Sequence, residues 1–241
     1  MQSIVSITIT ACMALAAVFL PLRIFQGSQA LGFSKSKSIR VAALTLLLIG
    51  GWLGLVIWGA LAGFFQTPVF EISGIPFTHV NYLILGPVIL GSLLIWLSPT
   101  TRALIDTFAP HRVMLIETAR AIGAVFLVRY FEGSLPGIFA LPAGIGDLFI
   151  GATAPVISYL YRTRGEHVRK LAIGWNILGL AELAMSFVMG YLAFGLKVIP
   201  GIDTSVNIQT AFPLVLIPGF GVPLMILMHI IALRLLTKRA R

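Results

Sequence analysis

The sequence holds few charged residues and a single cysteine, and each shortage excludes a class of protein. Charged residues make up 10% of the 241 positions, against about 25% in an average soluble domain. Hydrophobic residues make up 58% and the mean hydropathy is +1.00, so there are too few polar side chains to coat a water-facing surface. The lone Cys12 excludes an internal disulfide framework, a cysteine zinc site and a CxxC redox pair. The composition therefore predicts an all-α, polytopic membrane protein.

Acidic residues are also scarce, with 8 against 17 basic residues and a net charge of +9. In a soluble chain this excess would suggest nucleic acid as a partner. Here the basic residues gather in short clusters between apolar runs, which is typical of the cytoplasmic loops of membrane proteins. We therefore exclude nucleic acid and expect the lipid bilayer as partner, and we leave association with a second copy of the chain open.

Seven apolar runs are long enough to cross a bilayer, which takes about twenty residues. The predicted spans, in one transmembrane domain covering 1–241, are 4–22, 41–65, 81–97, 113–131, 141–161, 171–193 and 211–233. The second and third spans begin at Val41 and Asn81, and the sixth and seventh begin at the same offset from them. This spacing indicates a bundle of seven helices with a 3+1+3 parallel repeat. In the second span, the GxxxG steps 50–54 and 59–63 predict tight helix packing on both faces.

Most basic residues follow the first, third, fifth and seventh spans, whereas the opposite loops hold Lys197, with Arg129 at an edge. The positive-inside rule then places the N-terminus outside and the C-terminus in the cytoplasm, across the inner membrane. The first span could instead be a cleaved signal. We favour a retained helix, because no basic side chain precedes its apolar core.

Polar residues within the predicted spans are the candidate ligand- or proton-binding residues, because an ionisable group in a membrane is costly and marks function by default. They are Glu117, Arg120, Arg129, Asp147, Asn176, Glu182 and His229. No pattern among them indicates a catalytic set, a metal site or a cofactor. We therefore lean against an enzyme.

The fourth span carries two acid–base pairs at a spacing of three residues. Glu117 can pair with Arg120, and Glu132 with Arg129, on one face each. Nine residues separate the two arginines, which places them on opposite faces of an α-helix. In the structural alternative, each arginine only neutralises its neighbour and extends to an interface.

Asp147 is the most informative position in the sequence. Gly151, Ala154 and Ser158 follow it on one helix face and are small, so Asp147 should face the bundle. Six of the fourteen residues 133–146 are Gly or Pro, which predicts a broken backbone that is covered by protein or lines a water-filled cavity. Asp147 would then lie near a helix N-terminus. The alternative is a tight outer turn in which Asp147 caps a helix or pairs with Arg129.

Three further residues lie deep in the last spans. Glu182 has no basic neighbour in its own helix, so Arg120 is its candidate partner across the bundle. Asn176 favours an interhelical hydrogen bond over a ligand contact. His229, together with His111, could hold a b-type haem, but a histidine that packs and hydrogen-bonds is the favoured interpretation.

Several motifs resemble a pattern in uncharacterised bacterial multi-helix membrane proteins. They are Arg120-x-x-Gly123-x-x-Phe126-Leu127, Leu135-Pro136-x-x-Phe139-Ala140-x-Pro142-Ala143-Gly144-x-Gly146-Asp147, Trp175-Asn176-x-x-Gly179 and Pro218-x-x-x-x-Pro223-x-x-x-x-x-His229. The resemblance covers roughly the last 130 residues, and it implies a membrane location without any activity. The 3+1+3 layout is also similar to that of the SWEET sugar transporters, in architecture only, because their proline-glutamine signature is absent.

The residues together favour a membrane protein that binds or transports a small polar solute or proton through an outward-facing cavity near Asp147. The main alternative is a membrane-embedded structural or assembly subunit whose polar residues only join helices. A haem-binding or enzymatic membrane protein comes third.

Overall fold

The structure is a computed structural model that describes residues 2–66, 68–72, 75–195 and 211–238. In the first part of the chain, helices α1 and α2 are followed by a short hairpin, helix α3 and a connecting helix α4. The bounds are α1 Gln2–Ala30, α2 Lys35–Leu61, the 3-10 turn η1 Phe64–Gln66, β1 Pro68–Ile72, β2 Ile75–Thr78, α3 His79–Leu97 and α4 Pro99–Ile105. Strands β1 and β2 pair antiparallel. Lys197, from the predicted topology, lies outside the described residues.

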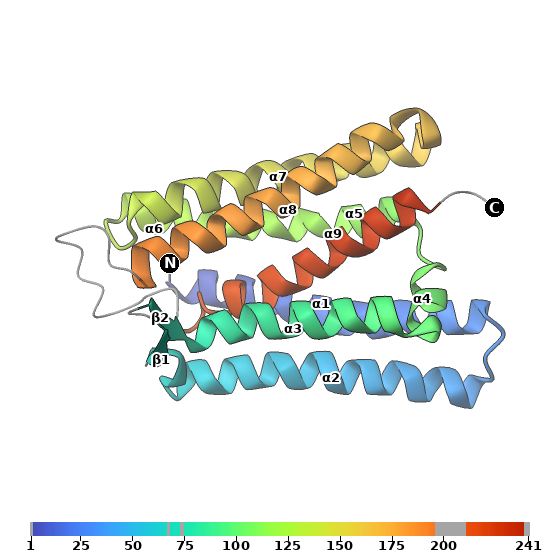
Figure 1. Ribbon diagram of the computed structural model, residues 1–241, viewed down its shortest axis with the longest axis horizontal. Helices are drawn as coiled ribbons and strands as arrows, with labels where there is room; N and C mark the ends of the chain where they lie inside the picture. Colours follow the sequence, from blue (N-terminus) through green and yellow to red (C-terminus); the bar gives the residue numbers. More distant parts are fainter. Residues whose placement is uncertain (1, 67, 73–74, 196–210, 239–241) are drawn as a thin grey trace.

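All elements in the described residues of the second part of the chain are helical. The bounds are α5 Pro110–Ile116, the 3-10 helix η2 Glu117–Ala124, α6 Val125–Phe131, α7 Gly137–Arg164, the 3-10 helix η3 Gly165–Val168, α8 Arg169–Gly190, the π-helical turns η4 Tyr191–Gly195 and η6 Ile217–Gly221, and α9 Val222–Thr237. Since α5, η2 and α6 follow one another along one line, they form a single rod (Figure 1). The described residues thus contain seven long helical rods, one for each predicted span.

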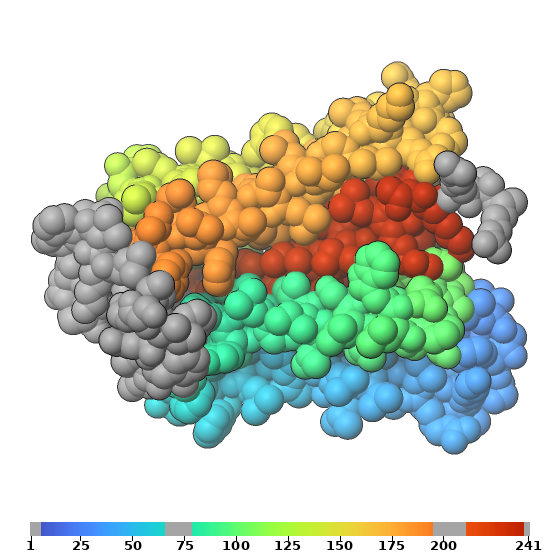
Figure 2. All heavy atoms as spheres, in the orientation of Figure 1, coloured from blue at the N-terminus to red at the C-terminus, as the bar shows by residue number. Residues whose placement is uncertain are grey.

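The rods form two groups with α9 between them. Helices α1, α2 and α3 lie on one side, and the α5–α6 rod, α7 and α8 lie on the other (Figure 1). Helix α9 runs obliquely through the middle and contacts α3, α5 and α8, and its surface is seen between α8 and α3 in Figure 2. Helix α1 begins and helix α9 ends at opposite ends of the bundle (Figure 1). This grouping does not display the 3+1+3 repeat, which stays a prediction.

The surface of the bundle is apolar along its length. Large side chains of α2 and α3, such as Leu47, Leu61 and Leu97, are at least 70% exposed. Five helical stretches are long and apolar enough to cross a membrane, and one of these stretches contains both α7 and α8. Packing by the GxxxG step 50–54 is not seen, because no described atom would lie within 4 Å of a Cβ atom at either glycine.

The predicted break over 133–146 is wrong for most of that segment. The turn is confined to the residues around Gly133, whose φ of 72° suits glycine, and α7 is helical from Gly137 through Pro142. Proline and glycine are tolerated within an apolar helix where neighbouring helices satisfy the backbone groups that these residues leave free. Gly144 serves packing, since a Cβ atom there would overlap Leu127. Asp147 therefore lies ten residues into α7 and not near its N-terminus.

At the end of the bundle where α9 ends, Asp106 joins the α4–α5 connection to α9 and to the residue that follows it. Its Oδ2 accepts hydrogen bonds from Lys238 Nζ at 2.8 Å and from Arg234 Nη2 at 3.2 Å. Burial raises the pKa of Asp106, but these two hydrogen bonds and the positive charges outweigh burial and hold the pKa below its usual value. This contact fixes the end of α9.

Candidate functional site

Six buried polar side chains from four helical segments meet in the interior of the bundle. Each is 8% exposed or less, and we call them the buried charge cluster. Its members are Glu117 and Arg120 on η2, Asp147 on α7, Asn176 and Glu182 on α8, and His229 on α9. All six were candidate residues from the sequence, and the structure brings them together.

Arg120 is the centre of the cluster because its guanidinium group contacts three other helices. Its Nε donates a hydrogen bond to Asp147 Oδ1 at 2.7 Å, and its Nη2 forms an ion pair with Glu182 Oε2. Its Nη1 donates to the Gly179 carbonyl oxygen at 3.3 Å and lies 3.4 Å from His229 Nε2. The predicted Arg120–Glu182 pair is confirmed. One side chain thus joins η2 to α7, α8 and α9.

The 3-10 geometry of η2 aligns the residues that face α7. A 3-10 helix has three residues per turn, so side chains three apart stack along one edge. Glu117, Arg120 and Gly123 have this spacing and are the buried residues of η2. An uninterrupted α-helix would rotate the three positions progressively out of line. The predicted continuous helix over 113–131 is therefore wrong at its centre, and this difference shapes the cluster.

Three glycines make the space that the cluster occupies. Each stands where a Cβ atom would overlap a cluster side chain: Gly123 beside Asp147, Gly146 beside Glu182, and Gly179 beside His229. The small face of α7 has a similar role, because a Cβ atom at Gly151 would overlap the backbone of Ala121. The prediction that Asp147 faces the bundle is confirmed. Close backbone approach is what allows short carboxylates to reach one arginine.

His229 is held by neighbours at both ring nitrogens. Its Nδ1 lies 2.9 Å from Asn176 Oδ1, and Asn176 in turn donates to the Ala172 carbonyl oxygen at 2.8 Å. Its Nε2 lies 3.4 Å from Glu117 Oε2 and 3.4 Å from Arg120 Nη1. This geometry supports the packing interpretation of His229 and argues against iron ligation. The Asn176 amide joins α8 to α9, as the sequence suggested.

Two predicted pairings differ in the structure. Among the described residues, no ion pair joins Glu117 to Arg120, because the guanidinium group is directed to α7 and α8. The alternative pair of Asp147 with Arg129 is also wrong. Arg129 Nη1 contacts Glu132 Oε2 at 2.8 Å, and both side chains are partly exposed. The sequence prediction that the two arginines serve different places is confirmed, and Arg129 is not part of the cluster.

The cluster has more acidic groups than basic ones. Glu117, Asp147 and Glu182 are carboxylic acids, Arg120 is a permanent cation, and a neutral His229 adds no charge. With all three carboxyl groups ionised, the buried cluster would carry two uncompensated negative charges. That is too costly in the interior of the bundle, where water does not solvate them. Both Glu117 carboxyl oxygens are enclosed without a hydrogen-bond donor in the described part of the chain. The cluster therefore needs a proton or another cation.

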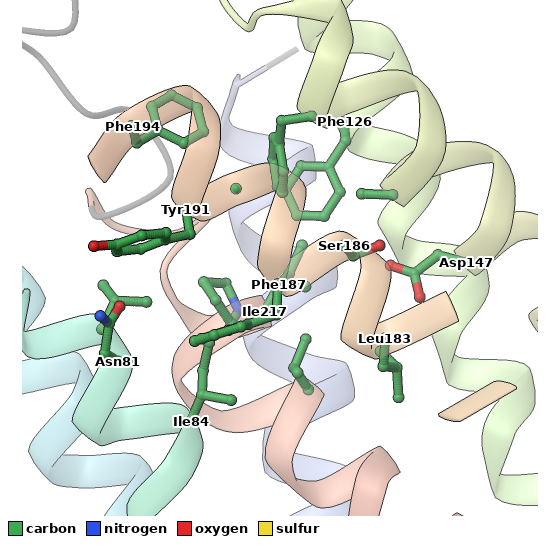
Figure 3. A pocket seen from close by; sticks show the side chains of 16 residues that line it. Asn81, Ile84, Phe126, Asp147, Leu183, Ser186, Phe187, Tyr191, Phe194 and Ile217 are labelled. Carbon is green, nitrogen blue, oxygen red and sulfur yellow. The ribbon is translucent and has the colours of Figure 1, made fainter. Parts of the chain in front are cut away.

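A cavity of about 80 Å³ meets the cluster at Asp147. Figure 3 shows the Asp147 carboxylate and the Ser186 hydroxyl close together at one side of this cavity. Ser186 Oγ donates a hydrogen bond to Glu182 Oε1 at 2.7 Å, which continues the cavity wall into the cluster. A second cavity of about 30 Å³, lined by Cys12, Arg120 and Asp147, lies on the side of α1.

Sequence reasoning missed the aromatic wall of the larger cavity. Its members are Phe126, Phe139, Phe187, Tyr191 and Phe194. Large apolar side chains occur throughout a chain of this composition, so no local signal separated these five from the others. The glycines 123, 146 and 179 did stand out as motif positions, but not as neighbours of particular charged groups.

The sequence model of one protein family matches the chain. It is described as "Domain of unknown function (DUF8737)" and matches residues 77–237, which is more than half of the chain and includes the whole buried charge cluster. No curated protein and no solved structure matches the chain.

Proposed function

The chain belongs to the DUF8737 family, and from its buried charge cluster we propose that it is an integral membrane protein that binds or transports a small polar solute or a proton. The observation that carries this proposal is the position of Asp147, which is both a member of the cluster and a wall of the larger cavity. A solute in the cavity would therefore contact a buried carboxylate directly.

The surroundings of Asp147 favour a ligand- or proton-binding role for its carboxylate over a purely structural role. Arg120 Nε donates a hydrogen bond to Asp147 Oδ1, and no donor among the described residues contacts Asp147 Oδ2. Purely structural buried carboxylates normally have all their oxygens hydrogen-bonded. The acid excess of the cluster adds a place for an exchangeable proton beside the cavity.

Replacing Asp147 by asparagine is expected to abolish proton uptake or flux while leaving most of the stability. The amide keeps the size of the side chain but removes its charge, and Arg120 retains Glu182 as partner. Proton movement is measured with a pH-sensitive dye in proteoliposomes, and stability by thermal unfolding in detergent. The matched control is Glu132→Gln, which removes a partly exposed carboxylate outside the cluster and should change neither result. Flux in Asp147→Asn equal to that of the unmodified protein would contradict the proposal.

The orientation that we propose places the hairpin end of the bundle outside and the C-terminus in the cytoplasm of an inner membrane. The α1–α2, α4–α5 and α7–α8 connections lie at the same end of the bundle as the last turn of α9 (Figure 1), and the helix ends that flank them carry most of the basic residues. That asymmetry supports the proposal through the positive-inside rule. The apolar outer surface supports lipid as its partner.

Reporter fusions test this orientation. A reporter fused after residue 241 should be active only in the cytoplasm, and one inserted at Glu71 should be active only outside, because the positively charged loops stay in the cytoplasm. A C-terminal fusion that is active outside would overturn both the orientation and the count of seven spans.

The alternative function, a membrane-embedded assembly subunit without transport, is favoured by one observation. Arg120 contacts α7, α8 and α9 at once, as a group that only joins helices would do. On this alternative, Asp147→Asn would lower the unfolding temperature strongly, and no solute or proton would bind.

A further inference from the structure

The larger cavity combines aromatic walls with a single charged group. Phe139 contacts Phe126 and Phe194 edge to face, with ring centroids 5.2 and 5.4 Å apart, and Phe187 and Tyr191 also line the space (Figure 3). Aromatic rings attract cations through their electron-rich faces, and such walls are a common way to hold alkylated ammonium ions. The lining thus favours a ligand that is both positively charged and apolar at its surface.

The charges around the cavity favour a cation for a second reason. Asp147 is the charged side chain among the lining residues, and none of the described lining residues is Lys or Arg. Among the described residues, Asp147 Oδ2 has no hydrogen-bond donor, and Tyr191 Oη is enclosed without a hydrogen-bond partner. An anion in the cavity would be repelled by the Asp147 carboxylate, and no described lining residue is a cation that could attract it. A cation would instead offset the acid excess of the cluster.

The size and polarity of the cavity narrow the class of ligand. A volume of about 80 Å³ exceeds the roughly 30 Å³ that one water molecule takes up in the liquid, and it leaves room for a ligand of only a few heavy atoms. A metal cation such as Na⁺ or Mg²⁺ needs several oxygen ligands, and this mainly aromatic wall supplies few. An alkylated ammonium ion gives up its hydration more readily because methyl groups cover its charge.

We propose that the cavity between α3, α7, α8 and η6 binds a small alkylammonium ion beside Asp147, in exchange for a proton of the buried charge cluster. This inference rests on the proposed function. The titratable or charged groups facing Asp147 are Glu117 and Arg120 on η2, Glu182 on α8 and His229 on α9, while α1 contributes Cys12. When the ammonium ion enters, one carboxylic acid O–H bond breaks and its proton leaves to water, so the charge of the site is conserved.

The test compares three probes on the purified full chain in detergent: tetramethylammonium, tert-butanol as a neutral molecule of similar shape, and acetate as an anion. Calorimetric titration in two buffers of different ionisation enthalpy reports both affinity and proton release. We expect tetramethylammonium to bind at least about tenfold more tightly than tert-butanol, with about one proton released. Its affinity should rise by up to about tenfold per pH unit over the range in which the proton is released. Acetate should not bind.

Two variants and one control test whether tetramethylammonium binds in the cavity beside Asp147. Asp147→Asn should weaken tetramethylammonium binding by at least about tenfold and abolish proton release, because the carboxylate that offsets the charge of the ion is gone. Phe139→Leu keeps an apolar wall but removes a ring, and it should weaken tetramethylammonium binding about threefold or more with little change for tert-butanol. Glu132→Gln, outside the cavity, is the control and should bind as the unmodified protein does.

Failure of this inference is distinguishable from failure of the proposed function. Equal affinity for tetramethylammonium and tert-butanol, or binding without proton release, overturns the ammonium–proton exchange but leaves a solute cavity in place. No binding of tetramethylammonium while Asp147-dependent proton flux persists overturns the ligand class alone. Absence of both binding and Asp147-dependent flux overturns the inference and the proposed function together.

Discussion

Replacing Arg120 by glutamine is expected to destabilise the folded protein by about 3 to 5 kcal/mol, because removing one partner of a buried ion pair leaves the other charge uncompensated. Here two carboxylates would lose their cation, since Arg120 contacts both Asp147 and Glu182. The Gly179 carbonyl oxygen also loses its donor. Unfolding by heat in detergent measures the change.

The double variant Arg120→Gln with Glu182→Gln supplies the control for this result. It removes the ion pair as a unit and leaves two neutral amides at the same depth, so part of the lost stability should return. A double-mutant cycle isolates the interaction because each change removes one partner. Additive losses would show that Arg120 and Glu182 do not interact, in contradiction to their contact in the structure.

Replacing Gly151 by alanine is expected to cost about 3 kcal/mol, which is large for one methyl group. The added Cβ atom would overlap the backbone of Ala121, and a backbone cannot turn aside as a flexible side chain can. Helix α7 and η2 would have to separate, which would also lengthen the contact between Asp147 and Arg120. The same unfolding measurement reports the loss.

Gly54→Ala is the matched control for this substitution. Gly54 lies within α2, and no described atom would lie within 4 Å of its Cβ atom, so alanine meets no obstacle. Alanine favours a helix over glycine by roughly 1 kcal/mol, and a small gain in stability is expected. A loss at Gly54 equal to that at Gly151 would contradict close packing of α7 against η2.

The sequence predicted correctly that Arg120, Asp147 and Glu182 face other polar groups inside the bundle. A buried charge must face other polar groups, and the small residues after Asp147 indicated the side on which a neighbour approaches. The pairing of Glu182 with Arg120 followed from the similar depth of the two residues and from the absence of a basic neighbour in the helix of Glu182. These predictions succeeded because an unpaired charge in an apolar medium is costly, so only a few arrangements of the charged side chains are stable.

The details that the sequence could not supply depend on backbone geometry. The composition of 117–124 gives no signal for a 3-10 helix, so the alignment of Glu117, Arg120 and Gly123 was not predicted. Glycine and proline in 133–146 suggested a broken backbone, whereas the glycines of α7 provide close packing. Asp147 consequently pairs with Arg120 and not with Arg129, because a continuous α7 carries it deep into the bundle.

The most direct test of the proposed function is the accessibility of the Asp147 cavity to water from outside. Ala143 lines this cavity one turn before Asp147, while Ala154 is buried on the same helix away from the lining. With Cys12 replaced by serine, Ala143→Cys and Ala154→Cys are exposed in right-side-out vesicles to a membrane-impermeant thiol reagent. A solute cavity open to the outside predicts labelling of Ala143→Cys, slowed by tetramethylammonium, and no labelling of Ala154→Cys. Equal resistance of both variants to the reagent would contradict an outward-facing cavity.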